Sequence, residues 1–326
     1  MTRFAPWAVD LTTEASRIRT YSARPMSART AAEIRSVNLR YHDAAAAGYD
    51  AKWGISYDER GRAQVLGKLA KALGGPLPRV QRSLEIGAGT GYFTLHLALA
   101  GLVARPVASD ISPGMLAALE RSAAELDVSV TTARCEAAEL PFADGSFDLV
   151  LGHAVLHHLP ELDAAFAEFA RVLRPGGRLV FCGEPSRGGH RLAEIPKRAG
   201  LLAAPIWRRA LGAPPRGVNG HSDHGLEPLV DVHSFGPAEL EARAARAGLH
   251  EVRVSGDELA SSWFGWLNRT LEASADPDSI PTGWYRFAQR GYLTLRRTDE
   301  RLLEPWLPAG AFYNLLLSAR SPSAER

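Results

Sequence analysis

Three glycines at alternate positions follow an acidic residue in the stretch SLEIGAGTGYF, residues 83–93. An apolar piece that ends near Glu85 precedes them and a helical pattern over 94–99 follows, so the stretch predicts a strand, a tight turn and a helix. A ligand can approach backbone that carries no Cβ, and the first amides of a new helix lack partners within it. The pattern indicates either a ligand-binding turn or a plain strand-to-helix connection.

Two further acids follow predicted strands. Asp110 closes a short apolar piece nineteen positions after Gly91, and its carboxylate could accept hydrogen bonds from both hydroxyls of a ribose. Glu136 follows a strand predicted over 128–133 and could accept the exocyclic amine of an adenine. Alone, each acid could be a helix cap or a solvated loop charge. Together with Glu85 and the glycines, they predict a pocket for a nucleoside with a short polar tail.

Other nucleotide sites fit this turn less well. A P-loop is excluded because no lysine follows the glycines, and the G-x-G-x-G spacing differs from the G-x-G-x-x-G of dinucleotide-binding enzymes. Glu85 would also repel a pyrophosphate.

Strand and helix patterns alternate around these residues, which predicts an α/β fold with a parallel sheet and helices on both faces. Earlier helices are expected over 31–50 and 62–73. After residue 184 the rhythm breaks in a segment rich in Gly, Pro, Arg and His (186–232), with a short apolar helix near 201–211. Later elements are expected as a helix over 236–248, a strand over 249–254, two helices within 257–309 and a final strand over 312–319.

The length of 326 residues fits one core domain with insertions. We expect an N-terminal arm and helices that partly cover the active site, a cofactor-binding Rossmann-like core, a lid-like insertion, and the end of the core sheet interrupted by a helical insertion at about 257–309. Their bounds are 1–75, 76–185, 186–235 and 236–326.

The formal net charge is only +2 and there is no long basic run, so neither nucleic acid nor an anionic membrane is required as a partner. Cys135 and Cys182 are far apart and form no C-x-x-C, which favours a reducing compartment. No apolar stretch is long enough to span a bilayer, and the first ten residues lack a signal-peptide pattern. We expect a cytoplasmic protein without stable membrane insertion.

Residues 83–184 resemble the class I S-adenosylmethionine-dependent methyltransferases. The motifs that carry the resemblance are LEIGAGTG (84–91), DISPGML (110–116), LPFADGSFD (140–148), HHL (157–159) and RVLRPGG (171–177). The resemblance implies a doubly wound, mostly parallel seven-stranded sheet whose last strand is antiparallel, with S-adenosyl-L-methionine as the cofactor. It leaves the insertions at 186–232 and 257–309 and residues 1–40 unexplained.

The resemblance also implies roles for individual residues. The methionyl end of the cofactor would lie on the turn, whose residues are Glu85, Gly87, Ala88, Gly89 and Gly91. Asp110 would bind the ribose, and Ile111, Glu136 and Ala137 would lie at the adenine. The family usually has Gly-Asp-Ala where this chain has Cys-Glu-Ala at 135–137, so the adenine contact departs from the pattern. His153 would lie at the pocket mouth, facing the methyl group.

The implied reaction is in-line attack on a sulfonium methyl, which mainly requires alignment. An oxygen nucleophile would also need a base, and histidine suits that role near neutral pH. His153, His157 and His158 are the candidates. His158 matches a histidine that pairs with an N-terminal tyrosine in some family members, and Tyr41 or Tyr49 could be that partner. Alternatively, the His-His-Leu run only caps or packs a helix.

A cluster of histidines and acids and two aromatic stretches each allow two interpretations. The histidines and acids of 221–224 and 231–233 could bind a metal, but no fixed helix orients them, so we predict a lid and no metal. The aromatic stretches 263–266 and 284–287 form either an apolar roof over the acceptor or packing against the core or a second subunit. A roof would predict a bulky apolar acceptor.

The predicted function is methyl transfer from S-adenosylmethionine to a small or medium-sized, apolar or aromatic organic molecule. We expect a small-molecule substrate and no nucleic-acid partner. A homodimer is also compatible with the sequence. The alternatives are an enzyme of the same fold that catalyses cyclisation or decarboxylation, and a non-catalytic cofactor-binding module. The acids at three strand ends argue against the module.

Overall fold

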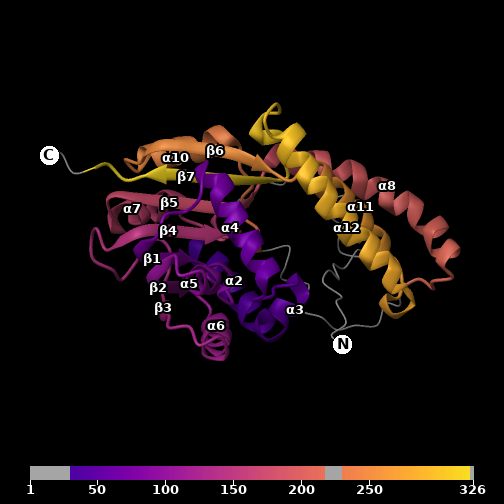
Figure 1. Ribbon diagram of the computed structural model, residues 1–326, viewed down its shortest axis with the longest axis horizontal. Helices are drawn as coiled ribbons and strands as arrows, with labels where there is room; N and C mark the ends of the chain where they lie inside the picture. The colour runs from indigo at the N-terminus through magenta and orange to yellow at the C-terminus, as the bar shows by residue number, and fades with distance from the viewer. Residues whose placement is uncertain (1–29, 217–229, 324–326) are drawn as a thin grey trace.

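The computed structural model describes residues 30–216 and 230–323 (Figure 1). Seven strands form one sheet in the order β3-β2-β1-β4-β5-β7-β6. β7 runs antiparallel to both of its neighbours and all other pairs are parallel, so the predicted fold is confirmed. The strands are β1 (Val80–Ile86), β2 (Val103–Asp110), β3 (Thr131–Arg134), β4 (Phe147–His153), β5 (Leu173–Pro185), β6 (His250–Asp257) and β7 (Asn314–Arg320).

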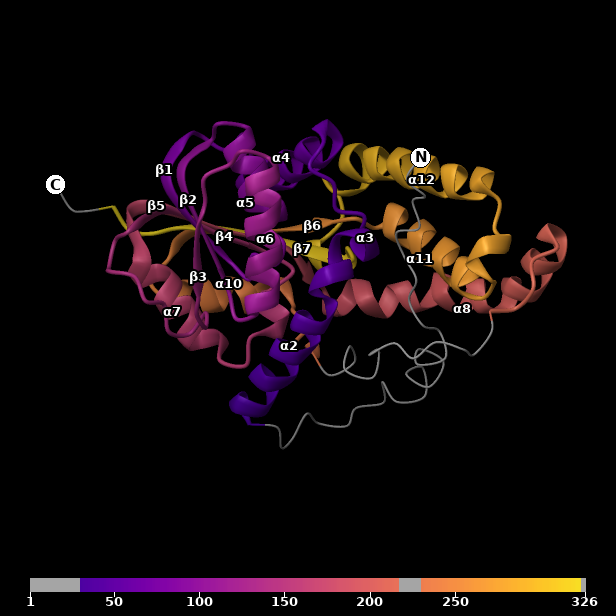
Figure 2. The same cartoon turned by 90° about the horizontal axis from the view of Figure 1, so that it is seen from below.

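Helices cover both faces of the sheet (Figure 2). The helices around the sheet are α2 (Ala31–Ala45), α3 (Tyr49–Trp53), α4 (Glu59–Leu73), α5 (Tyr92–Leu99), α6 (Pro113–Glu125), α7 (Leu162–Val172) and α10 (Pro237–Arg246). One face packs Phe166 and Phe169 of α7 against β4 and β5, and the other packs Phe93 of α5 with α4. The first six residues of β4 are buried, as expected for a parallel strand covered on both sides.

Three long helices form a separate layer beyond the carboxyl end of β5: α8 (Arg187–Leu211), α11 (Ala260–Ala273) and α12 (Thr282–Thr298). The two helices predicted within 257–309 are confirmed. The prediction of only a short helix near 201–211 was wrong, because α8 is continuous through Pro196 and Pro205. Packing against α11 keeps this segment helical despite its prolines and glycines. A Cβ on Gly200 would lie 2.8 Å from Cβ of Thr270, so only glycine lets the two helices approach so closely.

Buried charges attach this helical layer to the core. Lys71 Nζ on α4 lies 2.5 Å from Asp257 Oδ1 at the end of β6 and 2.7 Å from Glu304 Oε1. Asp299, which is fully buried after α12, accepts hydrogen bonds from the backbone amides of Leu259, Ala260 and Ser261 at the start of α11. The predicted arm over 1–29 and the part of the lid over 217–229 lie outside the described residues. In the described part of the chain, no helix combines the length and apolarity needed to cross a membrane.

Candidate active site

The glycine turn connects β1 to α5 and opens onto a cavity. Gly87, Gly89 and Gly91 have φ angles of 61°, 53° and 91°, which favour glycine. A Cβ on Gly87 would lie 2.3 Å from Val155, whereas one on Gly89 would meet no atom within 4 Å. Gly87 and Gly89 line the cavity. The turn therefore leaves backbone exposed to a ligand, which fits the cofactor that the sequence implies.

Asp110 lies at the end of β2 on the same cavity and is 8% exposed. Its Oδ2 accepts from the Gly89 amide and its Oδ1 from the Ser112 amide, both at 2.9 Å. Burial raises the pKa of Asp110, and the two amides oppose that rise. Since each carboxylate oxygen has two acceptor sites, lone pairs remain for ribose hydroxyls after these bonds.

Glu85 faces the start of α5. It is 2% exposed, and its Oε2 accepts from the Thr94 amide at 2.8 Å and from the Thr94 hydroxyl. Burial raises the pKa of Glu85 to about 8. The carboxyl group therefore satisfies an unpaired amide of α5, and a direct contact of Glu85 with the cofactor stays a prediction.

Most of the predicted site residues line the cavity. They are Tyr49, Gly87, Gly89, Asp110, Ile111, Glu136, Ala137, His153 and His158. Glu85, Ala88 and Gly91 belong to the turn without being among the described lining residues. Tyr49 comes from α3, and burial raises its pKa further above the usual value for tyrosine.

Helix α2 contributes three lining residues that the sequence did not reveal: Arg35, Asn38 and His42. Their spacing of three and four residues places them on one helical face, and this spacing was the only feature of the sequence that could have indicated them. Arg35 Nε lies 3.2 Å from Glu136 Oε2 and Arg35 Nη1 lies 2.7 Å from Glu161 Oε2. An ion-paired arginine from α2 therefore stands beside the acid expected at the adenine.

The other end of α2 is attached to α6. Asp43 Oδ1 accepts from the Ser112 hydroxyl at 2.5 Å and from the Gly114 amide at 2.9 Å. Negative charge is favourable at this helix N-terminus. Since Arg35 and Asp43 hold opposite ends of α2, the helix is fixed across the cavity with Asn38 between them.

His153 makes contacts that occupy its ring. The ring stacks on Phe93 with centroids 4.7 Å apart, and Nε2 lies 3.4 Å from Lys68 Nζ. An ammonium group only donates, so Nε2 accepts and Nδ1 carries the proton. Burial and the Lys68 charge lower the pKa of His153 well below its usual value. Because Lys68 occupies the Nε2 lone pair, His153 is poorly suited to remove a proton from a substrate.

His158 has the same tautomer as His153, but its protonated Nδ1 is held by a backbone carbonyl. Its Nδ1 lies 3.0 Å from the carbonyl oxygen of Val230, which only accepts, so Nδ1 carries the proton and Nε2 is left with a lone pair. Burial lowers the pKa of His158 well below its usual value, which keeps the ring neutral. His42 lies against it, with ring centroids 5.4 Å apart. His158 therefore lies as a neutral imidazole on the cavity wall, and its role as a base stays a prediction.

Glu184, at the end of β5, fixes the turn that carries these histidines. It is fully buried and accepts from the backbone amides of Val155, Leu156 and His157 at 3.0, 3.0 and 3.2 Å. Its Oε2 also lies 2.9 Å from His157 Nδ1. Burial lowers the pKa of His157, but Glu184 and Asp231 raise it by more, so its pKa lies above the usual value.

A group of metal-ligand types lies beside the cavity: His157, His158 and Asp231, with ligand atoms within 4.8 Å of one another. The Nδ1 atom of His158, which lies 3.5 Å from Asp231 Oδ1, already donates to Val230 and has no lone pair for an ion. His233 Nε2 lies 3.0 Å from the Leu159 carbonyl oxygen. The histidines and acid of 221–224 lie outside the described residues, and the absence of a metal stays a prediction.

The aromatic stretches separate into two environments. Trp284 packs edge-on against Trp207 with centroids 5.0 Å apart, inside the helical layer. Trp266 lies 5.7 Å from the ring of Tyr313, just before β7, and Tyr313 stacks on His190 at 4.3 Å. Trp284 therefore fits interior packing, whereas Trp266 belongs to an aromatic group near the carboxyl end of β5.

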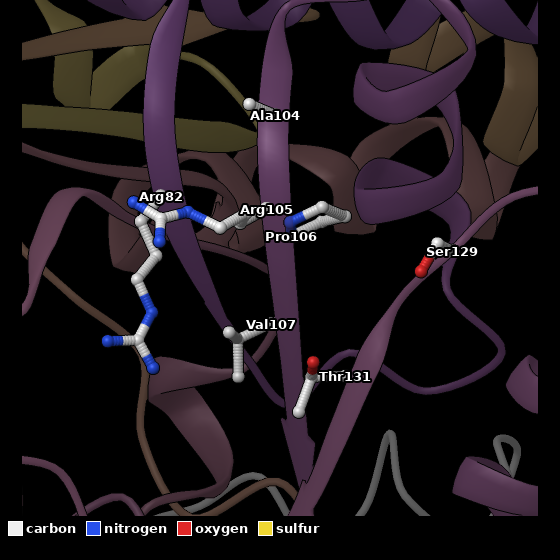
Figure 3. Close-up of a pocket in the computed structure, with 7 residues that line it drawn as sticks. All are labelled: Arg82, Ala104, Arg105, Pro106, Val107, Ser129 and Thr131. Atoms are coloured by element: carbon white, nitrogen blue, oxygen red, sulfur yellow. The ribbon is translucent and has the colours of Figure 1, made fainter.

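A second hollow lies toward the amino ends of β1, β2 and β3, where Arg82 and Arg105 extend from neighbouring strands (Figure 3). Arg82 also lies 4.6 Å over the Phe147 ring. Ligands of open α/β sheets bind at the carboxyl ends of the strands, so the cavity at the glycine turn is the candidate active site.

Comparison with known proteins identifies the family. A family profile described as "Methyltransferase domain" matches residues 84–181. The chain is 34% identical over 218 residues to a malonyl-[acyl-carrier protein] O-methyltransferase of Methylococcus capsulatus, covering 66% of this chain and 72% of that protein. The chain belongs to the class I S-adenosylmethionine-dependent methyltransferases. A demethylmenaquinone methyltransferase of Mycolicibacterium vanbaalenii is 37% identical over 175 residues, covering 52% of this chain and 68% of the relative.

Solved structures share the fold of this methyltransferase. Haemonchus contortus phosphoethanolamine N-methyltransferase 2 in complex with S-adenosyl-L-methionine matches with a TM-score of 0.56 and 20% identity, over 92% of this chain and 62% of that chain. The [4+2]-cyclase SpnF matches with a TM-score of 0.54 and 17% identity, over 91% and 98%. The cofactor of this methyltransferase is S-adenosyl-L-methionine.

Proposed function

We propose that this methyltransferase acts on a small or medium-sized, apolar or aromatic organic acceptor whose reacting group first gives a proton to His158. The observation that carries the proposal is the tautomer of His158, whose Nδ1 proton goes to the Val230 carbonyl at 3.0 Å while Nε2 keeps its lone pair on the cavity wall. A neutral imidazole can accept a proton at Nε2, and its lowered pKa makes it a weaker base than a free imidazole.

S-adenosylmethionine supplies, when bound, an electrophilic methyl group on a sulfonium. The residues that would hold it are Gly87 and Gly89 through their backbone, Asp110 through its carboxylate, and Glu136 with Ala137 at the adenine. Helix α2 would cover the bound molecule and limit the access of water, because the helix is fixed at both ends.

The chain's own residues would then prepare the acceptor. Glu184 holds the turn at residues 155–157, the Val230 carbonyl orients the imidazole of His158, and Nε2 takes the proton of the acceptor as its nucleophilic atom aligns with the methyl group. Positioning by such partners is what keeps a base effective, since small displacements cost large factors in rate.

The acceptor class rests on the apolar character of this end of the cavity. Val155, Leu159 and Pro160 line it near His158, and the aromatic group of Trp266 and Tyr313 lies near the end of β5. The names of the two relatives give different acceptors, demethylmenaquinone and a malonyl group on acyl-carrier protein. A quinone-type acceptor agrees better with an apolar site that contains a base.

The test compares His158→Gln with wild-type protein in an assay of S-adenosylhomocysteine formation from labelled cofactor, with a panel of phenols, quinols and carboxylates. We expect the turnover rate to fall about 10²–10⁴-fold with little change in cofactor Kd. Because the pKa of His158 lies below its usual value, the wild-type rate should be independent of pH above about 6.5, whereas the variant's rate should rise with pH.

His250→Gln, at an exposed position on β6, is the matched control and should keep full activity. An unchanged rate and pH profile in His158→Gln would mean that alignment alone drives the reaction. If wild-type protein forms no S-adenosylhomocysteine with any acceptor but consumes an added polyene or β-keto acid, cyclisation or decarboxylation replaces methyl transfer.

A further inference from the structure

Helix α8 buries small residues and exposes several large aliphatic ones. Its buried line consists of small or compact residues: Gly189, Ala193, Pro196, Gly200 and Ala204. Three of its six large aliphatic side chains point outward instead: Ile195 is 56%, Leu202 80% and Ile206 75% exposed, whereas the other three are half-buried. A surface helix normally turns its large apolar residues toward the core. The exposed aliphatic side chains on α8 therefore need a different explanation.

These side chains belong to one continuous stripe that also contains arginines. The outer stripe consists of Arg191, Ile195, Arg198, Leu202, Ile206 and Arg209, all of which are exposed. Steps of three and four residues keep all six on one face of the helix. The acid of α8, Glu194, lies off the stripe and pairs with Lys197 at 3.3 Å. Within the described ranges, no acid lies within ion-pair distance of the three arginines.

The outer stripe is a projecting edge of the molecule. α8 packs on α11 through its line of small residues, and α11 lies between α8 and α12 (Figure 2). A helix of 25 residues is about 37 Å long. A long exposed edge fits a flat surface better than it fits a small molecule or an inserted peptide.

We propose that the outer stripe of α8 binds the surface of an anionic lipid membrane. Arginines attract anionic headgroups, and the aliphatic side chains between them can enter the boundary between headgroups and acyl chains. A second copy of the chain fits less well, because two-fold antiparallel pairing of this stripe would bring the arginines near its two ends together. The contact is peripheral, which agrees with the lack of a spanning helix among the described residues.

The test measures cosedimentation of the full chain with vesicles of phosphatidylcholine alone and of phosphatidylcholine with 30% phosphatidylglycerol, a composition chosen at about the charge density of natural anionic leaflets. We expect binding to the anionic vesicles only, and weaker binding as salt is raised. The double variant Leu202→Gln/Ile206→Gln should bind at least tenfold more weakly. Arg198→Glu should lose about fivefold or more, since one basic residue near the surface is worth about that factor.

Matched controls use exposed residues elsewhere. Leu302→Gln, at a leucine that is 64% exposed, and Arg121→Glu, on α6, should leave vesicle binding unchanged. Circular dichroism and urea unfolding check that all variants fold. Failure of wild-type protein to bind anionic vesicles would overturn the proposal, as would equal losses in the stripe and control variants. Absence of vesicle binding combined with a dimer that Leu202→Gln dissociates would assign the stripe to a second copy.

Discussion

Substitution of Glu184 by glutamine probes whether a buried carboxylate holds the turn that carries the catalytic candidate. Glu184 is fully buried and accepts four hydrogen bonds, three from backbone amides of residues 155–157 and one from the His157 ring. The glutamine side chain is nearly the same size, so the change removes charge and one acceptor oxygen without creating a cavity.

The expected loss in unfolding free energy follows from these four hydrogen bonds. The amide oxygen of glutamine can still accept from Val155 and Leu156, but its NH2 group would face the amide and the ring N–H of His157, which are also donors. Each hydrogen bond to a charged group is worth about 1.5–3 kcal/mol, so two lost bonds cost about 3–6 kcal/mol. That is a large share of the roughly 5–15 kcal/mol by which a domain is stable.

The loss should depend on pH in a defined direction. Because the folded-state pKa of His157 is raised, the His157–Glu184 pair stabilises the fold fully below about pH 6.5 and loses this contribution as pH rises through the raised pKa. The difference in unfolding free energy between wild type and Glu184→Gln should therefore shrink from pH 6 to pH 9. The buried Glu85, with a pKa of about 8, also titrates here, but it is common to both proteins and cancels in the difference.

Urea unfolding followed by tryptophan fluorescence at several pH values measures this difference. Glu239→Gln is the matched control, because that acid pairs with Arg187 and Arg243 at the surface of α10 and should cost at most about 1 kcal/mol. A loss below about 1 kcal/mol in Glu184→Gln, or a difference that grows with pH, would refute the reasoning about this turn.

Three further predictions concern the cofactor and the helical layer. Asp110→Ala should raise the cofactor Kd at least tenfold in calorimetry, because the carboxylate also holds the Gly89 amide, and an unchanged Kd would contradict its role. Arg35→Gln should raise that Kd two- to tenfold through two half-exposed ion pairs, and stopped-flow measurements should locate the change in the dissociation rate. Asp299→Ala should cost about 2–4 kcal/mol in urea unfolding but leave cofactor binding unchanged, since its acceptors serve only the start of α11.

The core of the fold was predictable because local signals agreed with each other. A continuous apolar run such as 147–152 cannot be satisfied except between two layers, and the glycines of 87–91 cannot continue a strand. The capping serine at 112 with proline at 113 likewise fixed where α6 begins. These features depend on neighbouring residues, so reading along the chain was enough to find them.

Local propensity does not predict helix α8. Its glycines and prolines are helix breakers by local propensity, and they suggested a loop. In the folded chain, Gly188 and Gly189 lie against the backbone of Gly310 and Phe312, and Gly200 lies against Thr270, so close approach explains their presence. Tertiary packing outweighed local propensity, and these contact partners are 70 or more positions away in the sequence.

Only the part of the cavity wall formed by the glycine turn and the strand ends was predictable. Arg35, Asn38 and His42 come from α2, and their partners Glu136, Glu161 and His158 follow more than 90 residues later. Helical spacing could have placed the three on one face, but a polar helical face is ordinarily solvated. Nothing local distinguishes such a face from one that covers a cavity.

The division of the cavity also bears on how the acceptor is selected. The matched methyltransferase domain, residues 84–181, supplies the glycine turn, Asp110, Glu136 and His158, the residues proposed to hold the methyl donor and to act as the base. Helix α2, Val230 and Glu184 all lie outside that match, yet they cover the cavity, orient His158 and fix its turn. If the proposed roles hold, chemistry and acceptor selection come from different parts of the chain. Substitutions in α2 that keep Arg35 and Asp43 should change which acceptors are used before they change cofactor affinity.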